Sequence, residues 1–148
     1  MNIVEFLNQL NFIGLFLVFI ISKLLIETYL KIRNINSINK NKEMVPERFI
    51  DVVTDEEYEK SINYNIERIR FSILTSVFGV GVLLFFTIGG MLNNLTLFVQ
   101  GLTASNVIGA ILLGLLLIVI GEIIEIPLAV YSTFYIEEKY GFNKTTTK

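Results

Sequence analysis

The sequence contains no histidine, no cysteine and no tryptophan, and only 2 of its 148 residues are proline. A chain without histidine and cysteine forms no disulfide, offers no thiol nucleophile and builds no Ser-His-Asp triad. Catalytic zinc sites nearly always use imidazole or thiolate ligands, which argues against a zinc site made by this chain alone. The chain therefore lacks the usual reactive side chains of a hydrolase.

Charge is also scarce. Charged residues make up 18% of the chain against 53% hydrophobic residues, and the mean hydropathy is +0.62. A soluble domain has about 25% charged and about 45–50% apolar residues, and a globule this small cannot bury such an apolar surplus. The composition predicts a membrane protein. The net charge of −2 argues against an electrostatic nucleic-acid binder, so no nucleic-acid partner is expected.

Three stretches are nearly free of charge and are predicted to cross the membrane as helices, at about residues 6–28, 71–92 and 107–130. About 20 mostly apolar residues suffice to cross a hydrocarbon core of about 30 Å. The first stretch does not resemble a signal peptide, because Glu5 stands where basic residues are expected. The expected fold class is an all-α membrane protein, with three transmembrane helices plus an amphipathic cytoplasmic helix, in one N-terminal membrane domain over residues 1–148.

Basic residues predict the orientation of these helices. Four of them, with no acid among them, follow the first stretch: Lys31, Arg33, Lys40 and Lys42. Residues 93–106, predicted as a short loop, carry no charge. The positive-inside rule then places the N-terminus outside, residues 31–70 in a cytoplasmic loop and residues 137–148 in a cytoplasmic tail. The expected location is the bacterial inner membrane, or the endoplasmic reticulum membrane if the source is eukaryotic, with the lipid bilayer as a partner.

The cytoplasmic loop is predicted to contain a helix that begins near Asp55 and continues into the second span. Thr54 and Glu57 have the spacing of a capping box. Apolar side chains then recur at helical spacing along one face: Tyr58, Ile62, Ile66 and Ile69. Such a stripe indicates a surface helix leading into the membrane or a docking surface for a further domain, and the spacing alone favours the first.

Glu122 and Glu125 interrupt the third stretch on one face of its helix. Counted from Val107, Glu122 lies roughly 22 Å into the span, inside the hydrocarbon. A carboxylate facing lipid costs about 2.5–3.5 kcal/mol, so both residues are candidates to line a cavity, a cation site or a proton relay. The alternative is a wet, interfacial helix end kinked by Pro127. Two carboxylates without a histidine do not predict a metal site.

The most specific segment is residues 131–146, because it resembles the signature of the type I CAAX prenyl endopeptidases, a family of integral-membrane zinc metalloproteases. In that family a Pro-containing helix leads into Tyr-x-x-Phe-x-Ile-Glu-Glu-Lys-x-Gly-Phe-Asn. The matching residues are Pro127, Tyr131, Phe134, Ile136, Glu137, Glu138, Lys139, Gly141, Phe142 and Asn143. The sequence departs from the pattern at Tyr135, where Val is more typical, and at Glu125, where a small or apolar residue is expected.

A second patch resembles the same family. It reads Val45-Pro46-Glu47-x-Phe49-x-Asp51, followed by Glu57-Tyr58-x-Lys60-Ser61-x-x-Tyr64. Two patches in the correct order, together with the hydropathy, extend the resemblance over essentially the whole chain.

The resemblance implies the N-terminal transmembrane part of a membrane-embedded zinc endopeptidase, forming part of a chamber wall and catalytically incomplete by itself. Family members have seven membrane helices around a water-filled chamber, and their zinc is held by an H-E-x-x-H helix and a later Glu, all C-terminal to this region. No cofactor is expected in this chain, and zinc is expected in the full-length parent. The expected partners are the C-terminal catalytic part and a membrane-protein or peptide substrate.

No catalytic or metal-binding role is carried onto a residue of this chain. The signature either borders the chamber or sets the turn into the next segment, with Gly141 as a left-handed helix stop, and the structural role is favoured. The alternative function is a stand-alone three-helix membrane protein with a structural or regulatory role. A reading frame that continues past Lys148 to an H-E-x-x-H favours the protease, and a stop codon there favours the small protein.

Overall fold

The computed structural model describes residues 3–42 and 53–143. In these ranges the chain forms four α-helices and a short π-helical segment, and it contains no strand. The elements are α1 (Ile3–Asn41), α2 (Asp55–Thr87), α3 (Met91–Leu102), α4 (Asn106–Tyr131) and the π-helix η2 (Ser132–Glu137). Three helices are long and apolar enough to cross a membrane, so the expected all-α membrane fold is confirmed.

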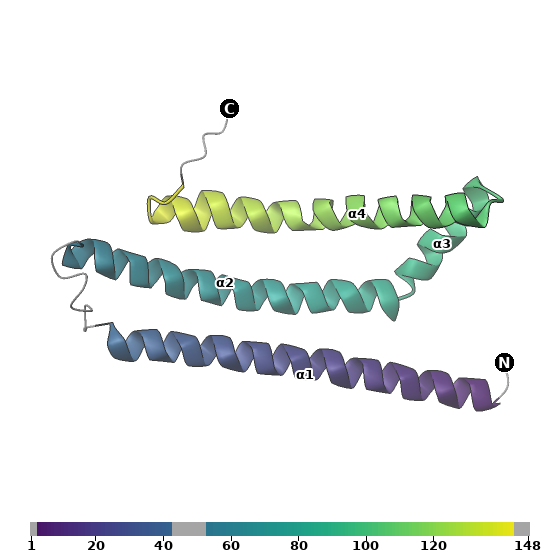
Figure 1. The fold of residues 1–148 in the computed structure, drawn as a ribbon, viewed down its shortest axis with the longest axis horizontal. Coiled ribbons are helices and arrows are strands. Elements are labelled where there is room, and N and C mark those ends of the chain that lie inside the picture. Colours follow the sequence, from purple (N-terminus) through teal and green to yellow (C-terminus); the bar gives the residue numbers. More distant parts are fainter. Residues whose placement is uncertain (1–2, 43–52, 144–148) are drawn as a thin grey trace.

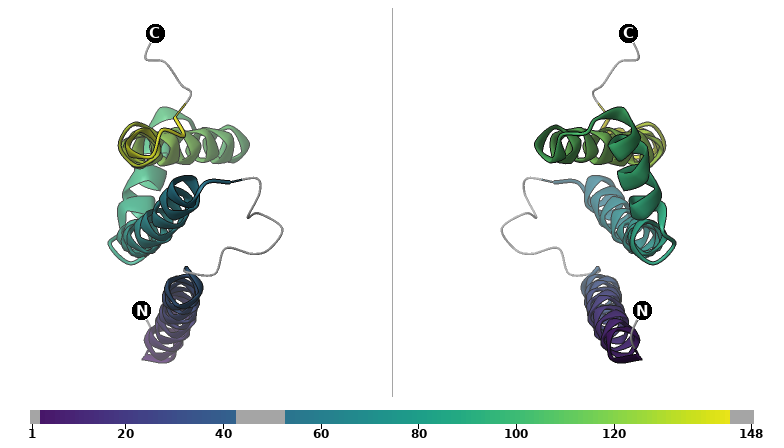
Figure 2. Two further views of the ribbon diagram at one scale, coloured as in Figure 1. Left: turned by 90° about the vertical axis from the view of Figure 1, so that its left-hand side faces the viewer. Right: turned by 90° about the vertical axis from the view of Figure 1, so that its right-hand side faces the viewer.

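The long helices α1, α2 and α4 lie alongside one another, with α2 between the other two (Figure 1). The short helix α3 joins the end of α2 to the start of α4 and contacts both. The side views show the same arrangement, with α1 on the side of α2 away from α4 (Figure 2). Helix α2 is therefore the element to which the rest of the bundle attaches.

Helix α2 begins with the predicted capping box. The Thr54 hydroxyl accepts from the Glu57 backbone N–H at 3.3 Å, while the Glu57 carboxylate accepts from the Thr54 backbone N–H at 3.1 Å. From this cap the helix runs unbroken to Thr87, so the amphipathic segment and the second apolar stretch form one helix, as predicted. The patch at residues 45–51 lies outside the described residues.

Two boundaries differ from the sequence prediction. Residues 93–106 are not simply a loop, because most of them belong to α3, and α2 ends at Thr87 rather than near residue 92. The physical reason is Gly90, whose φ of 79° is a left-handed conformation that ends one helix and begins the next. Since Leu95 and Val99 are buried, α3 is held by packing rather than by local sequence signals.

Helix α1 also extends further than the first apolar stretch, to Asn41. The first part of the predicted cytoplasmic loop, residues 31–41, is thus helical. Ser37 and Ile38 line a cleft together with Tyr58 and Ile62. The beginning of the apolar stripe on α2 therefore faces α1 of the same chain, a contact that neither of its two interpretations included.

Few side chains are fully covered. The most buried apolar residues are Val99 and Ile136, at 2% and 1% exposure, whereas large apolar side chains stand exposed along all three long helices. Phe19 on α1, Leu74 on α2 and Ile118 on α4 are examples. So much exposed apolar surface is incompatible with water and suits contact with lipid or with further membrane helices.

Candidate functional site

The signature segment folds into a tight turn at the end of the third membrane helix. The backbone N–H of Phe142 donates to the Glu137 carbonyl and that of Gly141 to the Glu138 carbonyl, both at 2.9 Å. These two bonds form a Schellman motif, which needs a left-handed residue after the helix. Gly141 supplies it with a φ of 68°, so the predicted left-handed helix stop is confirmed. The Asn143 side chain donates to the Glu138 carboxylate at 2.9 Å and braces the turn.

This turn packs against the first half of α2. The Tyr64 ring lies 4.7 Å from the Phe142 ring and 5.7 Å from the Tyr140 ring, measured between centroids. One turn further along α2, a carboxylate oxygen of Glu67 accepts from the Tyr140 hydroxyl at 2.6 Å and from the Lys139 ammonium at 2.7 Å. The two patches that resemble the protease family therefore meet in space, at Tyr64 and Phe142.

The Glu67 carboxylate also favours the protonated forms of its partners. Its hydrogen bond raises the pKa of Lys139, although burial opposes the shift. The same carboxylate, helped by burial, raises the pKa of the Tyr140 hydroxyl. Both groups keep their protons, and hence their donor hydrogens, throughout the neutral range.

The other signature residues lie in α4 and η2. Pro127 is inside α4, which continues through it, and the π-helical segment begins five residues later at Ser132. The Tyr131 ring lies 5.1 Å from the Phe71 ring of α2 and stacks at 4.8 Å on Tyr135. Phe134 in η2 is 39% exposed. The aromatic contacts thus continue from the turn along α2.

Glu122 and Glu125 are both exposed on α4. A mostly apolar groove of about 700 Å³ lies between α2 and α4, and Glu125 is one of its lining residues, opposite Phe71 and Thr75. Glu122 is not among those lining residues. Both carboxylates were candidates to line a cavity, and the structure places only Glu125 beside this groove.

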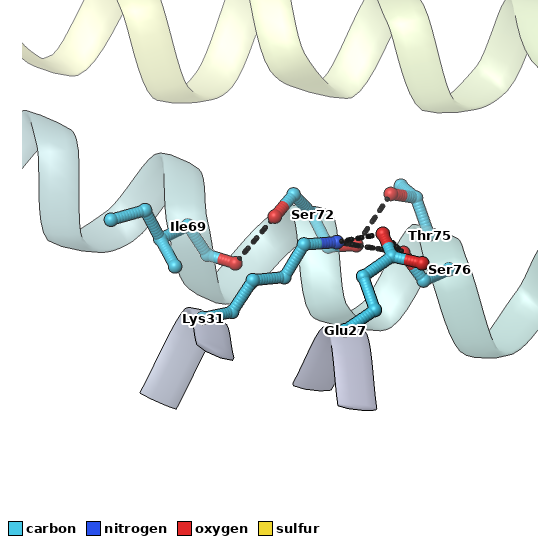
Figure 3. A network of polar contacts seen from close by, with 6 residues as sticks. All are labelled: Glu27, Lys31, Ile69, Ser72, Thr75 and Ser76. Carbon is cyan, nitrogen blue, oxygen red and sulfur yellow. Dashed lines mark hydrogen bonds and ion pairs between the residues drawn. The ribbon is translucent and has the colours of Figure 1, made fainter. Parts of the chain in front are cut away.

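A polar network joins α1 to α2 and was missed in the sequence (Figure 3). The Lys31 ammonium donates to the Glu27 carboxylate at 2.8 Å, the Ser76 hydroxyl at 2.8 Å and the Ser72 carbonyl at 3.1 Å. The Ser76 hydroxyl lies 3.1 Å from the same Glu27 oxygen. The available signal was an acid and a base at i and i+4 at the end of the first apolar stretch.

Comparisons with known proteins identify the family. The family model described as CAAX prenyl protease N-terminal, five membrane helices, matches residues 34–148. The chain belongs to this family. The resemblance seen in the signature residues is thereby confirmed.

Two curated relatives extend the match. CAAX prenyl protease 1 of Saccharomyces cerevisiae is 30% identical over 140 residues, and the probable CAAX prenyl protease 1 of Schizosaccharomyces pombe is 32% identical over 143 residues. Each match covers 88% of this chain and 30% of the relative. The chain thus spans about 30% of the length of these CAAX prenyl proteases and corresponds to their N-terminal membrane region.

The fold has a counterpart among solved structures. The crystal structure of S. mikatae Ste24p matches with a TM-score of 0.77 and 28% sequence identity, over 88% of this chain and 31% of that chain. Three helices of the described part qualify as membrane spans, whereas the family description gives five.

The residues of this chain do not fit a zinc site. The sequence has no histidine or cysteine. Within residues 3–42 and 53–143, no three acidic, histidine or cysteine side chains gather closely enough to hold a metal ion. No catalytic step through zinc is therefore assigned to this CAAX prenyl protease segment.

Sequence reasoning missed Glu67, the residue of α2 that binds the signature turn at residues 137–143, which is called the docked turn below. Glu67 belongs to neither quoted patch, although it follows Tyr64 at i+3 on the same helix. Helical spacing identifies it as a neighbour of Tyr64 on α2. Spacing does not reveal that the C-terminal segment returns to that face.

Proposed function

We propose that this chain forms part of the chamber wall of a membrane-embedded zinc endopeptidase of the CAAX prenyl protease type, and that it supplies no catalytic residue itself. The family match over residues 34–148 carries this proposal. The docked turn supports the structural half of it, since the signature side chains Lys139 and Phe142 are engaged by α2. In this role the signature fixes where the chain leaves the third membrane helix.

The zinc and its H-E-x-x-H ligands belong, in this proposal, to a C-terminal catalytic part of the same protein. Its substrate is a membrane protein or peptide. For a eukaryotic source the prenylated proteins implied by the relatives' name fit the family, with location in the endoplasmic reticulum membrane. For a bacterial source, cleavage or quality control of membrane proteins in the inner membrane fits better, because bacteria lack this prenylation.

Proteolysis by the full-length protein tests the proposal. We expect the purified full-length protein to cleave a membrane-protein or CAAX-type peptide reporter, and a zinc chelator to abolish the cleavage. The 148-residue chain alone, purified in parallel as the control, should bind no zinc stoichiometrically and cleave nothing. Chelator-sensitive cleavage by the chain alone would contradict the proposal. A gene that ends without an H-E-x-x-H would favour the stand-alone three-helix protein.

The orientation and the role of Glu125 form a second part of the proposal. We place the N-terminus outside and residues 31–70 inside, following the basic residues. We also place Glu125 against the aqueous chamber, since it lines the groove between α2 and α4, and Glu122 near that chamber, since a carboxylate at this depth avoids lipid.

Cysteine labelling tests both placements, because the chain has no cysteine of its own. In the full-length protein, a cysteine at position 50 should react from the cytoplasmic side and one at position 100 from the outside. A cysteine at Glu125 should react with a water-soluble thiol reagent, whereas the control at Ile123, on the opposite side of α4, should not. Reversed labelling of positions 50 and 100 would overturn the orientation. Equal reaction at positions 123 and 125 would remove Glu125 from the chamber wall.

A further inference from the structure

In the polar network between α1 and α2, the Lys31 ammonium has a partner for each of its donors. A lysine ammonium has three N–H donors, and Lys31 directs them to Glu27, Ser72 and Ser76 (Figure 3). The Lys31 side chain is only 22% exposed and that of Glu27 is 38% exposed. The charges are thus held in the interface between the helices rather than extended into solvent.

The network also lies at the predicted cytoplasmic edge of the apolar part of the bundle. Glu27 falls within the first apolar stretch, and Ser76 follows Phe71 by about 7.5 Å along α2. At this depth an unpaired charge is costly. Any displacement of α1 that separates Lys31 from its acceptors therefore carries a penalty that ordinary apolar contacts do not impose.

We propose that Glu27, Lys31, Ser72 and Ser76 form a directional lock that fixes the axial register of α1 against α2. The direction comes from the Ser72 carbonyl, a backbone acceptor that no rotamer change can turn into a donor. This carbonyl also accepts from the Thr75 and Ser76 hydroxyls, and from α1 it accepts a donor at position 31, while the carboxylate stands one turn earlier, at position 27. Sliding α1 by one turn, about 5.4 Å, would bring Glu27 to the place of Lys31 and set a carboxylate against that carbonyl.

Apolar packing alone specifies this register weakly. Beside the lock, α1 and α2 border a cleft of about 280 Å³, whose aliphatic lining residues are Leu24, Val80 and Leu83 and whose polar ones are Lys23 and the lock residues Glu27 and Ser76. Aliphatic side chains slide past one another at low cost, whereas charge-assisted hydrogen bonds are directional. Lys31 is therefore a positioning residue for α1. The family match begins at residue 34, so it does not include Lys31 or Glu27.

Crosslinking across that cleft tests the lock. The experiment uses the full-length protein in native membranes, with cysteines outside this chain replaced and new ones placed at Leu24 and Val80. A short bifunctional thiol reagent should join them in the parent. Lys31→Met should lower the crosslinking rate by about tenfold, because it removes three charge-assisted bonds. Lys31→Arg should retain most of the parent crosslinking rate, since the arginine guanidinium is also a cation with several hydrogen-bond donors.

The charge swap separates a directional lock from an ordinary ion pair. In the double variant Glu27→Lys with Lys31→Glu, an i,i+4 pair of opposite charges is still present. The lock predicts that the swap crosslinks as slowly as Lys31→Met, because Glu at position 31 faces the Ser72 carbonyl. Restoration of the parent rate by the swap would overturn the lock. The lock would also be overturned if Lys31→Met crosslinked at the same rate as the parent.

A second cysteine pair distinguishes a local shift of α1 from general unfolding. Cysteines at Tyr64 and Phe142 report the docked turn, where the two rings lie 4.7 Å apart. This second crosslink should be unchanged in every lock variant. The milder variant Ser76→Ala should slow the first crosslink and spare the second. Loss of both crosslinks in Ser76→Ala would overturn a lock that acts on α1 alone.

Discussion

Replacing Glu67 by leucine is expected to release the signature turn from α2. The Tyr140 hydroxyl then loses its acceptor at 2.6 Å and the Lys139 ammonium loses its partner at 2.7 Å. A charge-assisted hydrogen bond from a half-buried tyrosine contributes about 1–2 kcal/mol. We therefore expect a lower unfolding temperature of the full-length protein. We also expect a protease added to the sample to cleave the chain faster just after Asn143. Tyr140→Phe should reproduce most of the effect, and Lys139→Met less of it, because Lys139 is the more exposed partner.

The controls for this prediction lie on the same helix. Glu67→Gln keeps one acceptor oxygen and should fall between the parent and Glu67→Leu. Glu59→Leu changes an exposed acid two turns earlier and should leave cleavage after Asn143 unchanged. If Glu59→Leu and Glu67→Leu accelerated cleavage equally, the effect would come from the loss of any acid on α2, and the docking account would be wrong.

The docked turn should also loosen in alkali. The pKa values of Lys139 and Tyr140 are both raised in the folded protein, so their protonated forms are the ones that stabilise it. This stabilisation is complete below their ordinary pKa values and is lost as the pH rises through the raised ones. Cleavage after Asn143 should therefore stay constant across the neutral range and accelerate only at alkaline pH. The acceleration should be absent in Glu67→Leu, where the contact is already broken.

Ile136→Ala should be strongly destabilising. Ile136 is 1% exposed, the lowest exposure in the described part of the chain, and it lies in η2 directly before the turn. Truncating a buried isoleucine to alanine costs about 2–5 kcal/mol, because transfer free energy is lost and a cavity remains. The full-length protein in detergent should show a clearly lower unfolding temperature. The matched control is Ile123→Ala on α4, where the side chain is 60% exposed and the cost should be small. Equal losses would show that burial in η2 does not hold this end of α4.

Features encoded by neighbouring residues were predictable from the sequence. The cap at Thr54 and the helix stop at Gly141 each depend on side-chain chemistry or backbone freedom within a few positions. The three spans follow from the absence of charge over lengths that match a bilayer. Helix α3 was not predictable in this way. Its segment is uncharged like its surroundings, and the break at Gly90 falls inside the second apolar stretch.

The contacts that join the helices were beyond local reasoning. Lys139 and Glu67 are 72 positions apart, and Lys31 and Ser76 are 45 apart. Helical periodicity identifies which residues share a face, but it does not tell which other helix that face meets. The same limit explains why Glu122 and Glu125 were treated as a pair, although only Glu125 lines the groove between α2 and α4.

The docked turn has a consequence for how such a protein is made. The contacts that Tyr64 and Glu67 of α2 make with it involve residues 139–142, so they need nothing that a ribosome synthesises later. Chains emerge at about 5–20 residues per second, and N-terminal units generally fold first. The three membrane helices and their closing turn are therefore able to assemble in the bilayer before the C-terminal catalytic part of the proposed protease leaves the ribosome. In the proposed protease, the contacts of the signature turn with α2 therefore do not have to wait for the active site.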